Sequence, residues 1–259
     1  MPSEATESSL TSLDIVLPVL NEELDLPVNA KALHGFMAEH FQKYQWRIVV
    51  ADNGSTDSTL DIAKQLSQEF PRIDYMSLEQ RGRGRALRRA WTESTADVVG
   101  YMDVDLSTDL EALPALVDAV RDGECDIATG SRLIRGAEVE RRPFKREVAS
   151  RGYSLVFRSM FFTQFRDAQC GFKVLNRRTV RDIVPLVSDN RWFFDTEMLI
   201  LAEKNGYVVL EFPVKWTDDP DTRVKIVGTA YEDVKGLLRL RFRGLAKPTR
   251  DSGDATPHV

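Results

Sequence analysis

The segment DVVGYMDVD, residues 97–105, runs from an apolar stretch into two aspartates. Valine, tyrosine and methionine are typical of strands, so we expect a strand over residues 97–102. Asp103 and Asp105 follow this strand directly. Open parallel sheets bind ligands beyond the carboxyl ends of their strands, so the two aspartates mark a candidate site.

Strands and helices alternate on both sides of this segment. The patterns predict strands over residues 13–18, 46–51, 73–78 and 126–130, and helices over residues 24–44, 56–70, 84–92 and 108–121. The alternation favours an α/β fold with a mostly parallel central sheet flanked by helices. In the second half we expect a basic loop over 131–145, helices over 146–162 and 194–205, strands over 171–175 and 207–213, and an amphipathic segment over 229–245.

The composition is ordinary for a soluble globular protein, with 42% hydrophobic and 29% charged residues among 259. We expect one domain over residues 13–245, between flexible tails at 1–12 and 246–259. Cys125 and Cys170 are too few for a zinc cluster. We find no signal peptide pattern and no run of about 18–20 apolar residues. These features lead us to expect a cytoplasmic protein.

The formal net charge of −5 argues against nucleic acid as a partner, but this charge is unevenly distributed. Residues 132–178 contain twelve Arg or Lys and only four Asp or Glu. Residues 235–250 contain six basic residues and no acidic one. An acidic protein with a basic strip is typical of one that binds a localised anionic partner.

Carboxylates follow several of the expected strands. Asp52 comes after the strand at 46–51, as Asp103 and Asp105 do after theirs. On extended chain, residues two apart point to the same side, so Asp103 and Asp105 would repel each other. A divalent cation relieves this repulsion, and oxygen ligands suit Mg²⁺ or Mn²⁺ when substrate phosphates complete the coordination shell.

The turn RGRGR, residues 81–85, precedes an expected helix. Gly82 and Gly84 would let backbone N–H groups approach a phosphate at the helix N-terminus. The pattern is not GxGxxG and follows the third strand, which disfavours a dinucleotide-binding site.

The motifs PVLNE, VADNGSTDST, RGRGRA and MDVDLS occur in an order that resembles glycosyltransferase family 2 with a GT-A fold. In the second half GSR, RDAQCGFK, RWFFDTE and EFPVKWTD are similar to the polyprenyl-phosphate branch, and most of all to dolichyl-phosphate β-glucosyltransferases. The resemblance covers residues 13–243 and implies a nucleotide-binding half over 13–130 and an acceptor-binding half over 131–245.

The resemblance implies roles for individual residues. The donor positions are Pro18, Glu22 and Asp52 for the base and ribose, with Gly82, Gly84 and Asp103 nearby, and Asp103 and Asp105 match the metal-binding DxD. The positions that bind the acceptor phosphate are Arg132, Arg146, Ser150 and Arg223; the residue two before Arg223 is Asp221, where the family usually has Gly. The expected catalytic set is Asp105, Arg132, Arg146, Asp167 and Asp195.

The resemblance therefore implies metal-dependent, inverting transfer of a sugar from a nucleotide diphosphate sugar, UDP-glucose being favoured, to a polyprenyl phosphate. Asp195 and Glu197 are two apart on an expected helix and face differently, and we expect Asp195 to face the site. The segment 229–245 either lies on the inner face of a membrane, as a peripheral contact, or packs on the core with a basic outer face.

Four alternatives stay open. A GDP-mannose-dependent polyprenyl-phosphate mannosyltransferase would carry the same motifs. A family 2 enzyme with a soluble acceptor would need a general base, for which Asp195 is the candidate. A nucleotidyltransferase is disfavoured because no Gly-rich basic turn follows the first strand. A non-catalytic anion-binding module would bind without turnover.

Overall fold

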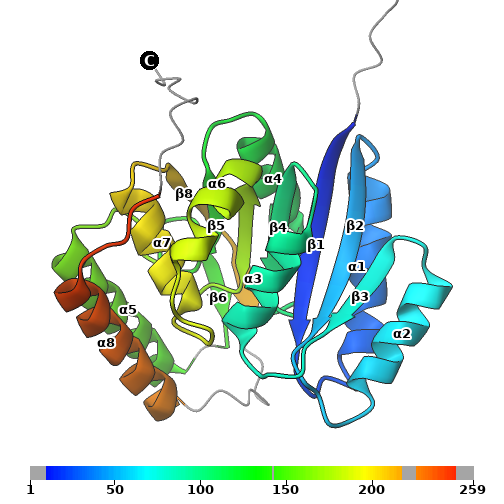
Figure 1. Ribbon diagram of the computed structural model, residues 1–259, viewed down its shortest axis with the longest axis horizontal. Coiled ribbons are helices and arrows are strands. Elements are labelled where there is room, and N and C mark those ends of the chain that lie inside the picture. The colour runs from blue at the N-terminus through cyan, green and yellow to red at the C-terminus, as the bar shows by residue number, and fades with distance from the viewer. Residues whose placement is uncertain (1–9, 142, 218–225, 249–259) are drawn as a thin grey trace, which may run out of the picture.

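The structure, a computed structural model, describes residues 10–141, 143–217 and 226–248, with the side chains of 226–230 excepted. Its centre is a seven-stranded sheet with the strand order β3-β2-β1-β4-β7-β5-β8 (Figure 1). The strands are β1 (Thr11–Val19), β2 (Tyr44–Asp52), β3 (Ile73–Ser77), β4 (Val98–Met102), β5 (Ile127–Ser131), β7 (Phe172–Asn176) and β8 (Val209–Pro213). A second, two-stranded sheet pairs β6 (Glu138–Glu140) with β9 (Lys215–Thr217).

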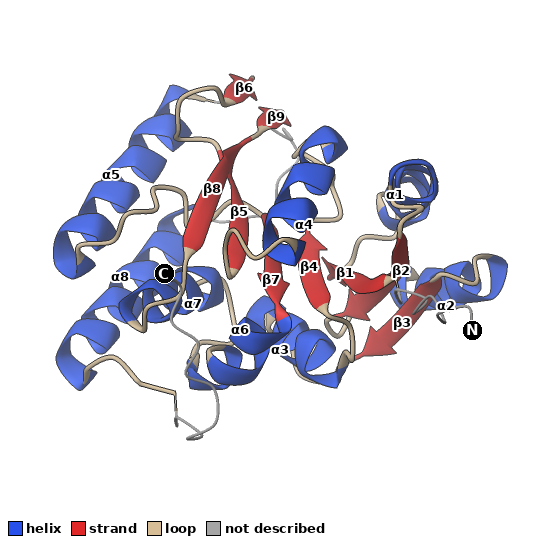
Figure 2. Cartoon of the chain, turned by 90° about the horizontal axis from the view of Figure 1, so that it is seen from above, coloured by secondary structure: helices blue, strands red, loops and turns tan. Residues whose placement is uncertain are grey.

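Helices cover both faces of the large sheet (Figure 2). On one face pack α1 (Leu26–His40), α2 (Thr59–Glu69) and α4 (Leu113–Arg121), the last preceded by the 3-10 turn η1 (Leu110–Ala112). On the other face pack α3 (Arg83–Glu93), α5 (Phe144–Phe161), α6 (Arg177–Asp182), η2 (Val184–Leu186), α7 (Phe194–Lys204) and α8 (Ile226–Arg243).

The alternation of side chains along the strands produces these two layers. In β1, Ile15 and Leu17 join the core under α1, α2 and α4, whereas Val16 joins the core on the opposite face. The central strands β1, β4, β5 and β7 are therefore mostly buried on both faces, which explains why they read as nearly continuous apolar runs.

The expected α/β fold with a mostly parallel sheet is confirmed. The exception is β7, which pairs antiparallel with both β4 and β5. The expected long loop at 131–145 was wrong in part, because it contains β6 and the start of α5. The missed β6, β9 and α6 are elements of three to six residues, whose short pattern carries little periodic signal.

No helix among the described residues is both long and apolar enough to cross a membrane. The expected amphipathic segment at 229–245 forms most of α8. Leu237 and Leu240 are buried on its inner side, while Leu238 and Phe242 are exposed.

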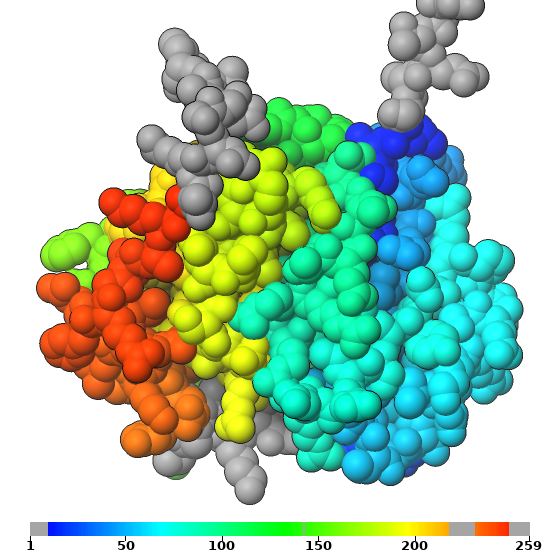
Figure 3. Space-filling model, in the orientation of Figure 1, coloured from blue at the N-terminus to red at the C-terminus, as the bar shows by residue number. Residues whose placement is uncertain are grey.

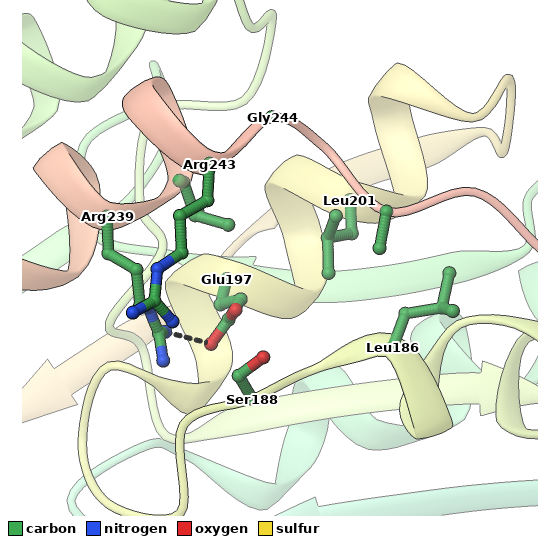
Figure 4. A pocket seen from close by; sticks show the side chains of 9 residues that line it. Leu186, Ser188, Glu197, Leu201, Arg239, Arg243 and Gly244 are labelled. Carbon is green, nitrogen blue, oxygen red and sulfur yellow. Dashed lines mark hydrogen bonds and ion pairs between the residues drawn. The ribbon is translucent and has the colours of Figure 1, made fainter.

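The helix α8 lies along one flank of the molecule, beside the segment that contains α7 (Figure 3). Gly236 lets it approach closely, because a Cβ atom there would lie 2.4 Å from the Phe193 ring. Arg239 donates to Glu197 on α7 at 2.6 Å, and Figure 4 shows these two side chains pointing toward one another. The loop residue Gln169 donates to the buried Asp233 at 2.5 Å.

Burial raises the pKa of Asp233 to about 7, with Asp189, Asp195 and Glu232 contributing in the same direction. An unfolded aspartate titrates near about 3.9. The unfolded chain therefore loses this proton first, and the native state should lose stability as the pH rises from about 4 to about 7.

Asp233→Asn should remove this loss, because an amide keeps a polar partner for Gln169 without a charge. The free energy of unfolding of the variant, relative to wild type, should rise by up to about 4 kcal/mol between pH 4 and pH 7. Denaturant unfolding at several pH values measures it. Glu39→Gln, at an exposed position on α1, is the control, and parallel pH profiles for Asp233→Asn and wild type would contradict the prediction.

Candidate active site

The turn before α3 is held close to the segment that precedes α7. Gly82 has a φ of +152°, its N–H donates to Asn53 Oδ1 at 2.6 Å, and a Cβ atom there would lie 2.4 Å from the carbonyl oxygen of Asn190. At Gly84 a Cβ atom would lie 2.5 Å from Phe194. Both glycines therefore have a packing role, and their contact with a donor phosphate stays a prediction.

Between these glycines, Arg83 joins two of the expected site carboxylates. Its side chain is nearly buried, with Nη2 2.8 Å from Asp103 Oδ1 and Nη1 2.6 Å from Asp195 Oδ2. The guanidinium also lies over the rings of Tyr101 and Trp192, at 4.6 and 5.1 Å from their centroids. Burial alone would lower the pKa of Arg83, but the surrounding negative groups outweigh it and raise this pKa. Arg83 is therefore a permanent cation between Asp103 and Asp195.

Asp103 lies against a glycine of the neighbouring chain segment. Its N–H donates to the carbonyl oxygen of Gly171 at 2.9 Å. A Cβ atom at Gly171 would lie 1.7 Å from Asp103 Oδ2, so only glycine leaves room for this carboxylate. The side chain of Asp103 is 40% exposed, and a ligand can therefore reach it.

Asp105 is exposed, and its Oδ1 accepts from the N–H of Ser107 at 3.0 Å. The expected extended chain at 103–105 was wrong, because the N–H of Leu106 donates to the carbonyl of Asp103 at 3.2 Å and closes a turn.

The described residues contain no group of three or more His, Cys, Asp or Glu placed to hold a metal. Two carboxylates at an open turn nevertheless fit a hard cation whose remaining ligands come from substrate phosphates.

Asp195 also lies near a buried lysine. Lys173 is fully buried in β7, and its Nζ donates to the carbonyl of Cys170 at 2.6 Å and lies 3.8 Å from Asp195 Oδ1. Glu197 points elsewhere, toward Arg239 and the N–H of Asp189. The different directions expected for Asp195 and Glu197 are thus seen in α7.

Arg132 forms a second buried ion pair, with Asp167. Its Nε and Nη2 donate to the two carboxylate oxygens at 2.8 and 2.9 Å, and its N–H donates at 3.0 Å. Burial would raise the pKa of Asp167, but the charge and hydrogen bonds of Arg132 outweigh it and lower this pKa to about 2. The structure therefore brings Arg132 and Asp167 together, with Nη1 of Arg132 outside the pair.

The other expected site residues lie on separate elements. Asp52 ends β2 and is buried, and its oxygens accept from the N–H of Ser55 and the hydroxyl of Ser77. Pro18 is half-buried in β1, and the N–H of Glu22 donates to Thr59 Oγ1. Arg146 and Ser150 are both half-buried on α5. Arg223 lies outside the described residues.

Sequence reasoning missed Arg83, Lys173 and Gly171 as parts of this arrangement. Arg83 stood between two glycines that were singled out, and Lys173 interrupts an otherwise apolar strand. A lysine in such a strand needs a partner, and this was the available signal.

Gly171→Ala should displace the Asp103 carboxylate, because the added methyl group and Oδ2 cannot occupy the same space. We expect a loss of about 1–3 kcal/mol in the free energy of unfolding. Gly35→Ala is the control: nothing lies within 4 Å of a Cβ atom there, so this helical position should gain up to about 1 kcal/mol. Thermal and denaturant unfolding compare the two, and equal stability would contradict the clash.

The comparisons with known proteins agree on one family. The family model for glycosyl transferase family 2 matches residues 14–184. A relative is glycosyltransferase AglD of Haloferax volcanii, 40% identical over 253 residues, which are 95% of this chain and 39% of that protein. Another is a dolichyl-phosphate beta-glucosyltransferase of Dictyostelium discoideum, 29% identical over 90% of this chain and 75% of that protein.

A solved structure has the same fold. It is glucosyl-3-phosphoglycerate synthase from Mycobacterium tuberculosis in complex with Mn²⁺, UDP-glucose and glycerol 3-phosphate, with a TM-score of 0.64 at 18% identity. The match covers 94% of this chain and 82% of that one. The expected family and fold are therefore confirmed: the chain belongs to glycosyl transferase family 2 and has the GT-A fold.

Proposed function

We propose that this chain transfers glucose from UDP-glucose to a polyprenyl phosphate such as dolichyl phosphate, with inversion and with Mg²⁺ or Mn²⁺. The observation that carries this proposal is the Asp103–Arg83–Asp195 arrangement beyond β4, which joins an open carboxylate to a buried one through a permanent cation. The relatives named for dolichyl phosphate support the acceptor class.

The state of Asp195 favours a phosphate acceptor over a hydroxyl acceptor. A hydroxyl acceptor needs a general base within hydrogen-bond reach. Asp195 is 3% exposed; its Oδ2 accepts from Arg83, and its Oδ1 is buried 3.8 Å from Lys173 Nζ, so neither oxygen is open to a substrate hydroxyl. A phosphate acceptor is already ionised near neutral pH and needs no such base.

The chemical step is one displacement. An oxygen of the acceptor phosphate attacks the anomeric carbon from the face opposite the leaving group. The bond from this carbon to the diphosphate oxygen breaks, and its electron pair leaves with UDP. An α-linked donor therefore gives a β-linked product. A bound divalent cation would neutralise charge on the leaving diphosphate.

The protein's own part in this step is to position two anions and reduce their repulsion. Asp103 and Asp105 would hold the cation, and Asp52 with Glu22 and Pro18 would hold the nucleoside. Arg83 adds positive charge beside Asp103. Arg132 could contact the acceptor phosphate through Nη1 while Asp167 fixes its orientation.

The surface formed by α5 and α8 supports contact with a membrane that carries the acceptor. These helices contact each other, and both expose aromatic side chains: Phe144 on α5, Phe162 directly after it, and Tyr231 and Phe242 on α8. Exposed Lys145, Arg151, Lys235 and Arg241 lie on the same helices. Aromatic and basic residues together favour an anionic interface.

The transfer assay is direct. Labelled UDP-glucose, a short polyprenyl phosphate and MnCl₂ should yield a glucosylated lipid phosphate, and chelation should abolish it. Asp103→Asn should reduce turnover about 100-fold or more, because it removes charge where the diphosphate leaves. Asp109→Asn is the matched control, since the side chain of Asp109 accepts from the N–H of Glu111 and so caps η1.

Parallel arms test the alternatives. GDP-mannose as the better donor would identify a mannosyltransferase, and transfer to saccharides alone would identify a soluble acceptor. The proposal is rejected by a lack of transfer to lipid phosphate from UDP-glucose, GDP-mannose and UDP-N-acetylhexosamines.

The membrane contact makes its own prediction. Phe144→Asp with Phe242→Asp should reduce sedimentation with vesicles that contain phosphatidylglycerol, because each change places a negative charge on the apolar surface. Tyr75→Asp, at an exposed position on β3, is the control. Unchanged sedimentation of the double variant would exclude this surface.

A further inference from the structure

The position of Arg83 bears on how the site takes up its cation, an inference that rests on the proposed function. We propose that Arg83 is an internal counter-ion of Asp103, which keeps affinity for a divalent cation low until the donor diphosphate is present. Arg83 and the cation would compete for the same carboxylate, since Nη2 lies 2.8 Å from Asp103 Oδ1.

Arg83 is the fixed partner in this competition. Its side chain is 9% exposed, its Nη1 is held by Asp195 at 2.6 Å, and two aromatic rings flank its guanidinium. The side chain of Asp103 is 40% exposed and belongs to a turn. When a cation arrives, the carboxylate of Asp103 is therefore the group that changes partner, and Arg83 stays.

Within the cluster around Arg83 the charges cancel, and Asp105 adds one further negative charge at the open turn. Asp103 and Asp195 carry two negative charges, and Arg83 and Lys173 carry two positive ones. A bare dication that binds Asp103 therefore takes the counter-charge of Arg83 and is repelled by it. A nucleoside diphosphate brings phosphate oxygens that would ligate the cation. Its negative charge would also pair with Nη2 of Arg83 once Asp103 has changed partner.

Lys173 cannot replace Arg83 in this role. It is fully buried, its Nζ donates to the carbonyl of Cys170, and the carboxylate with which it forms an ion pair, at 3.8 Å, is that of Asp195. The counter-charge on Asp103 itself thus comes from Arg83.

Binding of Mn²⁺, followed by electron paramagnetic resonance with and without UDP, tests the proposal. Without UDP, Arg83→Gln should bind Mn²⁺ about tenfold more tightly than wild type, because the charged competitor of Asp103 is gone. Asp195→Asn should bind it several-fold more weakly, because Arg83 then pairs with Asp103 alone. Arg89→Gln, an exposed position on α3 paired with Glu93, should bind as wild type does.

With UDP present, the advantage of Arg83→Gln should disappear. The proposal is overturned if Arg83→Gln binds free Mn²⁺ no more tightly than wild type. Should that variant fail to fold by circular dichroism, an unchanged or increased affinity of Asp195→Asn overturns it instead. A wild-type chain that binds no Mn²⁺ even with UDP would reject the metal dependence of the proposed function, which is a separate result.

Discussion

A guanidinium removed from water must keep its charge, because arginine does not give up its proton in proteins. Arg83 meets this constraint with two carboxylates and two aromatic faces, and these partners come from two distant segments of the chain, residues 101–103 and 192–195. The turn after β4, the start of α3 and the start of α7 are thereby tied to one point. Removing either carboxylate would leave one positive charge of this cluster without a counter-charge, so these elements depend on one another.

The helix α8 is likewise held by polar contacts between charged and amide side chains. The helix α8 contacts α7 through Arg239 and Glu197, and contacts the 167–171 segment through Asp233 and Gln169. That segment also carries Asp167, the partner of Arg132. A helix that exposes aromatic and basic residues is thus linked to the residues expected to contact the acceptor phosphate, through contacts that are polar and specific rather than only apolar.

Much of the fold and part of the site could be predicted from the sequence. The strands at 13–18, 46–51 and 97–102 were visible because buried parallel strands read as apolar runs, and the ligand-binding edge then located Asp52, Asp103 and Asp105. The pairing of Arg132 with Asp167 was not predictable, because it joins residues 35 positions apart. Arg83 was missed because a basic residue in a Gly-rich turn normally faces solvent, and only tertiary packing turns it inward.

The reversed direction of β7 has a consequence for where site residues occur along the chain. Met102, the last residue of β4, pairs with Phe172, the first residue of β7. In parallel strands the residues that face ligand come after the strand, whereas in β7 they come before it. Residues Asp167–Gly171 therefore lie at the ligand-binding edge although they precede a strand. Residues that follow parallel strands and residues that precede an antiparallel strand thus meet at the same edge of the sheet.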